Sequence, residues 1–134
     1  MTTTIEVDED ERGPWTVLSI RGELDLVTSP RLRRRVHDAV AGGHRDLVVD
    51  LSAVRFCDSS GVGVLIGARR LLRSCGGRLR LILPAADAEG EAHVERVLSA
   101  LGVRRLFDVH GDVEAAVGEE PLGEEPLSEC RTAP

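Results

Sequence analysis

The chain has 134 residues, a formal net charge of −6, and 42% hydrophobic and 30% charged residues. This length supports one domain, and no apolar run is long enough to span a membrane. The acidic, polar start is unlike a signal peptide, so we expect a cytoplasmic protein. All 17 basic residues are arginine, which excludes a P-loop lysine, a Schiff-base lysine and the lysine of a receiver-domain phosphoacceptor site.

Charge is unevenly distributed along the chain. Residues 1–11 carry five acids and no base, residues 112–134 carry seven acids and one arginine, and the body between them carries sixteen arginines against eleven acids. A basic body with acidic ends could suggest an anionic partner, but a solvated arginine-rich surface is the simpler interpretation. Two phenylalanines, one tryptophan and no tyrosine offer few stacking side chains, so no nucleic-acid partner is expected.

The first elements expected along the chain are an edge strand at residues 3–7 and a strand at residues 15–20, where the residues alternate as in a half-buried strand. Gly22 is expected to end that strand. Ser29 and Pro30 then predict the cap and the first position of a helix, which continues at helical spacing until two glycines end it.

The centre of the chain alternates strand and helix. A continuous apolar run at residues 47–51 is typical of a central strand, residues 60–74 have helical spacing, and residues 79–83 alternate until a proline stops them. A third amphipathic helix follows at residues 94–101, and residues 105–109 predict a last short strand.

Two acidic segments and a terminal helical turn complete the chain. We expect a mobile loop at residues 85–92, a helical turn or two at residues 112–117, and a disordered tail at residues 118–134, where Gly-Glu-Glu-Pro-Leu occurs twice in succession. The fold class predicted for residues 1–117 is α/β, a single small domain with a mixed four- to five-stranded sheet and about four helices packed on it.

Residues 56–63 are the most informative segment, because they lead from a buried strand into a helix. Asp58, Ser59 and Ser60 are thereby expected at a helix N-terminus, where backbone N–H groups are unpaired and the helix dipole favours anions. A serine there can be read by a partner and can carry a phosphate. Taken alone, the four residues from Asp58 to Gly61 are also what simple helix capping requires, since Asp and Ser are preferred N-cap residues.

Several other residue patterns bear on chemistry. Gly61, Gly63 and Gly67 suggest a dinucleotide fingerprint, but glycines at this spacing more often let a helix pack close to a sheet. Asp25 and Asp50 follow strands, as Asp58 does, and the three could converge on magnesium. Holding loop backbone or contacting a partner is the preferred role for Asp25 and Asp58, and capping a turn for Asp50. We therefore expect no metal and no cofactor.

The cysteines and histidines show no spacing typical of a metal site. Cys57, Cys75 and Cys130 are odd in number and lack a C-x-x-C pair, so neither a disulfide framework nor a zinc site is indicated. The helix N-terminus beside Cys57 could lower its pKa, although a small buried hydrophobic role is preferred. The four histidines are interpreted as surface or packing residues.

Three motifs together carry a family resemblance. Gly-Glu-Leu-Asp at residues 22–25 follows the first long strand, Asp-Leu-Ser at residues 50–52 ends the central strand, and Asp-Ser-Ser-Gly-Val-Gly occupies residues 58–63. In this order and spacing they resemble the STAS domain, specifically the bacterial anti-sigma factor antagonists, over roughly residues 3–117. The acidic loop, the acidic tail and the lack of lysine depart from the usual pattern and bear on which partner is recognised.

The resemblance implies a switch and not an enzyme. In that family the serine directly after the aspartate of the last motif is phosphorylated, and Ser59 occupies this position here. The surface that contacts the partner would include Asp25, Asp58, Ser59, Ser60 and Gly61. The unphosphorylated protein would bind an anti-sigma factor, often itself a serine kinase, and so free a sigma factor. Phosphorylation would end binding and a serine phosphatase would restore it. The alternatives are a STAS scaffold without phosphorylation in another signalling or transport assembly, and a small nucleotide-binding or phosphoryl-transfer enzyme.

Overall fold

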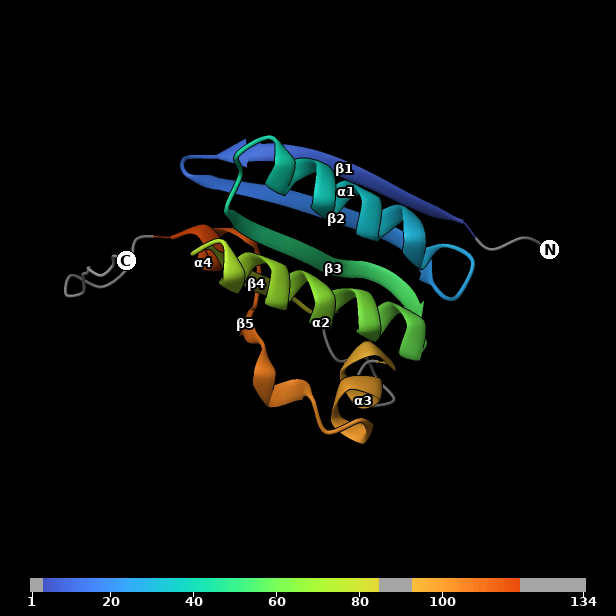
Figure 1. Cartoon of the computed structure of the whole chain (residues 1–134). Coiled ribbons are helices and arrows are strands. Elements are labelled where there is room, and N and C mark those ends of the chain that lie inside the picture. Colours follow the sequence, from blue (N-terminus) through green and yellow to red (C-terminus); the bar gives the residue numbers. More distant parts are fainter. Residues whose placement is uncertain (1–3, 85–92, 119–134) are drawn as a thin grey trace.

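The computed structural model describes residues 4–84 and 93–118, which form one five-stranded sheet with its strands in chain order (Figure 1). The first two strands are antiparallel and every later neighbouring pair is parallel. The strands are β1 (Ile5–Arg12), β2 (Trp15–Leu24), β3 (Asp46–Cys57), β4 (Arg78–Ile82) and β5 (Asp108–His110). The helices are α1 (Ser29–Ala41), α2 (Ser59–Ser74), α3 (His93–Ala100) and α4 (Val113–Val117), with a short 3-10 helix η1 (Arg104–Leu106) before β5. The predicted α/β class, with a mixed sheet and four α-helices, is confirmed.

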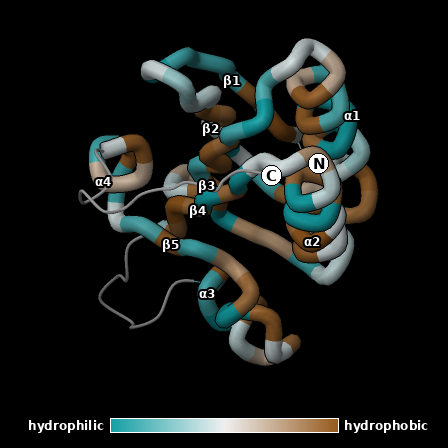
Figure 2. The backbone as a smooth tube through the Cα atoms, turned by 60° about the vertical axis from the view of Figure 1, so that its left-hand side comes forward, coloured by the Kyte–Doolittle hydropathy of each residue, from teal (hydrophilic) through white to brown (hydrophobic). Residues whose placement is uncertain are grey.

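The helices are divided unequally between the two faces of the sheet. Strands β2 to β5 are added in one direction, and crossovers between parallel strands are right-handed, so the connecting helices α1, α2 and α3 are expected on the same face. Figure 2 shows α4 on the opposite side of the sheet from α1 and α2. No helix among the described residues is long and apolar enough to cross a membrane.

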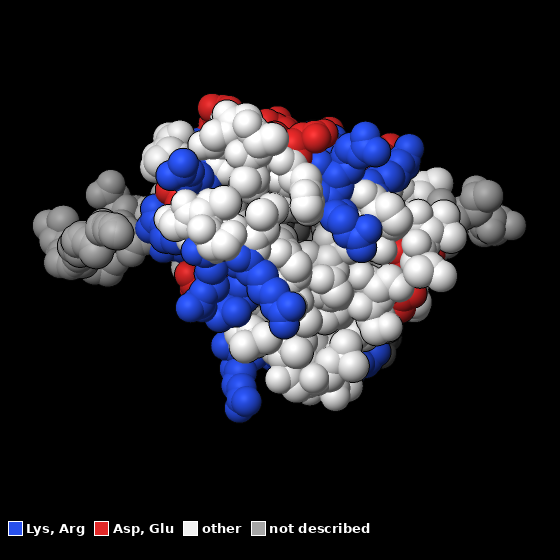
Figure 3. Space-filling model, viewed as in Figure 1, with Lys and Arg blue, Asp and Glu red and all other residues white. Residues whose placement is uncertain are grey.

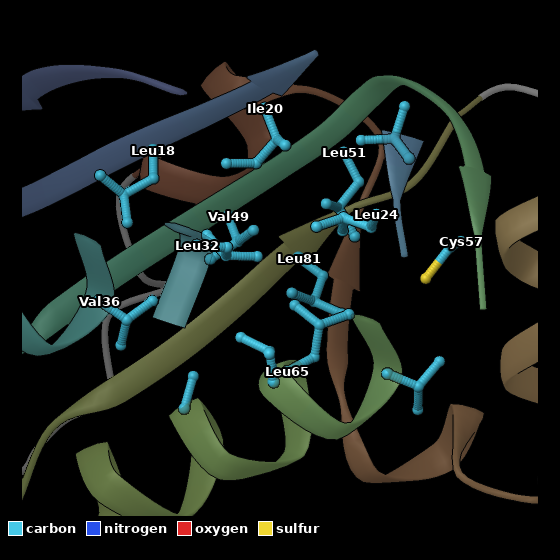
Figure 4. Close-up of a cluster of buried hydrophobic side chains, with 14 of the residues drawn as sticks. Leu18, Ile20, Leu24, Leu32, Val36, Val49, Leu51, Cys57, Leu65 and Leu81 are labelled. Carbon is cyan, nitrogen blue, oxygen red and sulfur yellow. The ribbon is translucent and has the colours of Figure 1, made fainter. Parts of the chain in front are cut away.

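The main core lies between the sheet and the three connecting helices. Val49 and Leu51 of β3 are fully buried in it, together with Leu32 of α1 and Leu65 of α2 (Figure 4). A smaller cluster on the other face packs Ala116 of α4 against side chains of three strands; those side chains are Trp15, Val17, Val48 and Ile82. Strand β3 is thus covered on both faces, which explains its continuous apolar run.

The two N-terminal strands are longer than predicted. The edge strand extends to Arg12; Ile5 at its start is buried, whereas the four consecutive acids at residues 8–11 are exposed. Strand β2 passes through Gly22 and ends at Leu24, so the prediction that Gly22 ends it is wrong. Gly22 has a φ of 111° at an irregularity in the β2–β3 register, and a Cβ there would collide with the backbone carbonyl of Thr4. A glycine therefore permits the strand to continue.

Three other boundaries differ from the sequence-based expectation. The central strand does not end at residues 50–52, because β3 continues to Cys57. Ser29 is the first residue of α1 and not its cap; Thr28 is the N-cap and makes no side-chain cap hydrogen bond. The strand expected at residues 105–109 begins only at Asp108, because the preceding residues form η1. The loop predicted at residues 85–92 and residues 119–134 of the predicted tail lie outside the described residues.

Alanine substitution at Gly22 tests whether close approach, and not backbone conformation alone, requires glycine there. We expect Gly22→Ala to lower the free energy of unfolding by about 3 kcal/mol or more. Gly13 is a matched control, since its φ of 63° is also positive but a Cβ added to it would meet no atom within 4 Å. Gly13→Ala should cost only about 1 kcal/mol. Urea unfolding of both variants measures the difference, and equal losses would contradict this account.

Candidate functional site

The candidate site lies where β2 and β3 end beside the start of α2. Leu24 and Cys57, the last residues of these strands, are register partners, and the backbone N–H of Asp58 donates to the carbonyl oxygen of Leu24 at 3.0 Å. The loop at residues 25–28 and the first turn of α2 therefore lie at the same edge of the sheet (Figure 1). Parallel strands bring their carboxyl ends together in this way, so segments distant in sequence share one surface.

Asp58 caps α2 with its own carboxylate. Its Oδ1 accepts hydrogen bonds from the backbone N–H of Ser60 at 2.8 Å and of Gly61 at 3.4 Å, and its carbonyl accepts from Val62 at 3.2 Å. The expectation of unpaired N–H groups at this helix terminus is therefore wrong for Ser60 and Gly61, because the Asp58 side chain already accepts from both. The terminus thus offers an anion fewer free N–H groups than an uncapped helix would.

Ser59, the residue proposed as phosphoacceptor, is exposed at the first position of α2. Ser60, the next residue, is half-buried, and its backbone N–H is held by the Asp58 carboxylate. The two adjacent serines are therefore not equivalent. Ser59 is the exposed serine of the two at the N-terminal end of α2. The carboxylate of its neighbour Asp58 is already hydrogen-bonded to the backbone of Ser60 and Gly61.

Gly61 is buried against the two strand ends. A Cβ at this position would lie 2.8 Å from Cys57 Sγ and 2.9 Å from Leu24 Cβ, closer than side-chain atoms pack. The packing interpretation is confirmed for Gly61. It is wrong for Gly63 and Gly67, which are exposed and whose added Cβ would meet nothing within 4 Å. The contribution of Gly61 to a partner contact stays a prediction.

Asp25 organises the loop that lies beside Ser59. Its Oδ1 accepts from the backbone N–H groups of Val27 and Thr28, both at 3.0 Å, and from the Thr28 hydroxyl at 3.1 Å. The predicted role of Asp25 in holding loop backbone is thus confirmed. As a result the loop is turned outward, and the side chains of Leu26 and Val27 are each 74% exposed.

A third apolar side chain reaches solvent at the end of β3. Phe56 is 41% exposed, and its ring stacks on the imidazole of His93 with the ring centres 5.1 Å apart. His93 Nε2 also lies 3.1 Å from the carbonyl oxygen of Cys57, so the start of α3 is joined to the end of β3. Sequence reasoning missed this pair, since no spacing relates residues from separate elements.

Comparison with known proteins assigns the family. Residues 4–116 match the family model of the STAS domain. The chain belongs to the STAS domain family. The anti-sigma-B factor antagonist of Bacillus subtilis (strain 168) is 30% identical over 111 residues, covering 83% of this chain and 85% of that protein. The anti-sigma F factor antagonist of Paenibacillus polymyxa is 28% identical over 116 residues, covering 86% and 94%. Among solved structures, an anti-sigma factor antagonist from Mycobacterium paratuberculosis aligns with a TM-score of 0.73 and 25% identity, covering 85% of this chain and 92% of that one.

This STAS domain does not bring its three candidate aspartates together as a metal site. Asp50 Oδ1 instead accepts from the backbone N–H of Ser52 at 2.9 Å inside β3, which continues to Cys57, so the prediction that Asp50 caps a turn is wrong. Over residues 4–84 and 93–118, the one group of ligand atoms within 4.8 Å of one another belongs to Glu9, Glu11 and His44. Two of those side chains already have protein partners: Arg35 lies 3.6 Å from Glu9, and Thr16 Oγ1 lies 3.0 Å from His44 Nδ1.

The Cys57 thiol of the STAS domain is an inert core group. Its residue is 1% exposed, and burial first, then the negative charge of Asp58, raises its pKa from 9.0 to about 12. The alternative that the helix terminus lowers this pKa is therefore wrong, because Asp58 has taken the terminal N–H groups and placed a negative charge beside the sulfur. The preferred interpretation of Cys57 as a small buried hydrophobe is confirmed.

Alkaline titration should separate Cys57 from the other two cysteines. The chain has no lysine and no tyrosine, so thiols dominate its proton release above pH 9. Because the folded pKa of Cys57 lies above its unfolded value, its contribution to stability is full below pH 9 and is lost as pH rises toward 12. The thiolate absorbance that is lost in Cys57→Ala should therefore appear well above pH 9 in the unchanged protein. A difference between the two proteins that is complete near pH 9 would contradict this assignment.

Proposed function

We propose that this STAS domain is an anti-sigma factor antagonist acting in the cytoplasm, and that its role is regulatory and not catalytic. In its unphosphorylated form it binds an anti-sigma factor and frees a sigma factor. Phosphate on Ser59, transferred by a serine kinase, ends that binding, and a serine phosphatase restores it. The observation that carries the proposal is the exposure of Ser59 at the start of α2, beside a loop that turns two apolar side chains to solvent.

The composition of this surface suits a protein partner. Leu26, Val27 and Phe56 are large apolar side chains exposed around the ends of β2 and β3, whereas such side chains are usually buried. Apolar and aromatic side chains in the centre of an interface contribute most of its binding free energy. A neutral hydroxyl at Ser59 can be enclosed by such an interface at little cost in desolvation.

A phosphate on Ser59 would oppose binding electrostatically. It adds close to two negative charges, and two N–H groups that would otherwise be available to neutralise them are held by the Asp58 carboxylate. The Asp58 charge next to it adds repulsion. Because Ser59 is exposed, the free protein keeps the phosphate in water and its fold unchanged, so the penalty falls on the complex, where the charge must be desolvated.

Phosphorylation by the cognate kinase tests the choice of residue. Incubation with that kinase and ATP should place one phosphate on Ser59, located by mass spectrometry, and none on Ser59→Ala. Ser60→Ala is the matched control, since it alters the neighbouring half-buried serine and should be phosphorylated like the unchanged protein. Phosphate on Ser60, or on neither serine, would contradict the proposal.

Binding measurements on charge variants test the mechanism. Ser59→Asp should weaken binding to the anti-sigma factor by about 100-fold or more, equivalent to about 2.8 kcal/mol, as measured by calorimetry. Ser59→Ala should bind within about threefold of the unchanged protein, because a methyl group fits where a neutral hydroxyl fits. Equal binding by both variants would exclude a charge switch at this position.

The apolar loop gives a test that does not depend on phosphorylation. Replacing both Leu26 and Val27 by serine should weaken partner binding by at least about tenfold, because exposed apolar area is lost from the interface. Leu101→Ser is the matched control, since Leu101 is 48% exposed but follows the C-terminal end of α3. All these side chains are exposed, so thermal unfolding should be nearly unchanged. A comparable loss of affinity in the Leu101 variant would place the interface elsewhere.

A further inference from the structure

The opposite end of α2 carries a groove rich in arginine. It has a volume of about 480 Å³ and is lined by Arg69 and Arg73 of α2, Arg78 and Leu79 of β4, Leu106 of η1 and Asp108 of β5. We call it the α2 arginine groove. Figure 3 shows blue side chains gathered below and to the left of the centre of the molecule, apart from a second blue group at the upper right. Apolar leucines between guanidinium groups give the α2 arginine groove a mixed character.

The charge of this surface is not balanced within the described residues. Helix α2 contains Arg69, Arg70 and Arg73 and no acid, and none of the three forms an ion pair with the described part of the chain. Arg69 and Arg73 are four residues apart, a spacing at which like charges repel on a helix. The helix dipole compensates Arg73, in the last turn, but not the earlier two.

Acids on the first strand of the domain are already engaged by other arginines. On β1, Glu6 and Asp8 lie 3.1 and 3.4 Å from Arg21, and Glu9 pairs with Arg35. Arg21 and Arg35 thus offset part of the N-terminal acidic charge at the far edge of the sheet. Asp108, the acid that lines the α2 arginine groove, lies 3.1 Å from Arg80. No described acid pairs with Arg69 or Arg73, so an anion for them has to come from outside the described residues or from a partner.

The sequence supplies such an anion directly after α4. Residues 119–134 contain five glutamates against one arginine, and the repeated Gly-Glu-Glu-Pro-Leu places a leucine two residues after each acidic pair. Two carboxylates with a nearby leucine match a groove lined by Arg69 and Arg73 together with Leu79 and Leu106. Arg78, which also lines it, is already paired with Asp46 at 3.1 Å. One Gly-Glu-Glu-Pro-Leu repeat is therefore complementary to the α2 arginine groove both in charge and in apolar character.

The segment is also long enough to reach the groove. Helix α4 contacts β4 and β5, the strands that carry Arg78, Leu79 and Asp108, and the described chain ends at Gly118 just after it. Sixteen residues can span up to about 50 Å, several times the radius of gyration of about 13 Å expected for a domain of this size. Because the segment is tethered, its effective concentration at the groove is in the millimolar range, which favours even weak contacts.

We propose that residues 119–134 dock on the α2 arginine groove of the same chain through their glutamates. The contact lies at the opposite end of α2 from Ser59, so it is distinct from the surface proposed to bind the anti-sigma factor. It neutralises the arginines of α2 and makes this face unavailable to other anions.

A spin label on Cys130 measures this contact in the full chain. Cys75→Ser removes the half-buried thiol that follows α2, and Cys57 is buried, so the label attaches to the tail alone. Nuclear magnetic resonance should show broadening of the backbone amides of Gly76, Gly77 and Leu79 in about 50 mM salt, reduced at least roughly threefold in about 0.5 M salt, which screens exposed ion pairs. Absence of broadening at low salt, or broadening that ignores salt, would overturn the proposal.

Paired arginine variants identify the docking surface. Replacing Arg69 and Arg73 by glutamine should remove the broadening, whereas replacing Arg33 and Arg34, which subtracts the same charge from exposed positions of α1, should leave it unchanged. The reverse result would assign the tail to α1 and contradict the proposal. Broadening in a mixture of labelled protein and isotope-enriched unlabelled protein would show that the tail binds a second copy, which would also overturn it. Neither outcome bears on the role of Ser59.

Discussion

The hydrogen bond from the Asp58 N–H to the carbonyl oxygen of Leu24 ties the end of β2 to the start of α2, and Gly61 allows the two to approach. A side chain on Gly61 would meet Cys57 Sγ and Leu24 Cβ, so the first turn of α2 could not rest on both strand ends. Every property of the site follows from this junction. It fixes Asp58 as the cap, directs Ser59 to solvent, and sets the loop that Asp25 organises beside it.

The same junction explains why this helix terminus differs from an anion-binding one. A phosphate-binding terminus leaves its N–H groups free for the ligand, whereas here the Asp58 carboxylate accepts from two of them and adds its own negative charge. An anion is therefore attracted to this terminus less than to an uncapped one. A covalently attached phosphate on Ser59 would remain a solvated charge on the surface, which suits a residue proposed to repel a partner when modified and to admit it when neutral.

Helix α2 separates two surfaces of different character. Its 16 residues span about 24 Å, with the exposed serine and apolar loop at one end. At the other end stand Arg69 and Arg73, which form no ion pair within the part of the chain that the structure describes. Its buried side chains, such as Leu65 and Leu72, pack into the main core, so the helix is a fixed spacer between the two surfaces. The distance is greater than the screening length at physiological salt, so charges at one end act only weakly on the other.

Local sequence determined the order of elements, the capping role of Asp58 and the burial of Cys57, because each depends on residues close in the chain or on apolar periodicity. It failed at Gly22, at the start of α1 and at Gly63 and Gly67, where the outcome depends on which backbone or side chain from another element lies nearby. The stacking of Phe56 on His93, the outward turn of Leu26 and Val27, and the raised pKa of Cys57 arose only in the tertiary structure. These features share one physical reason. The neighbours, the burial and the local charge of each residue depend on strands and helices that are distant in sequence but close in space, and a short-range sequence pattern does not contain that information.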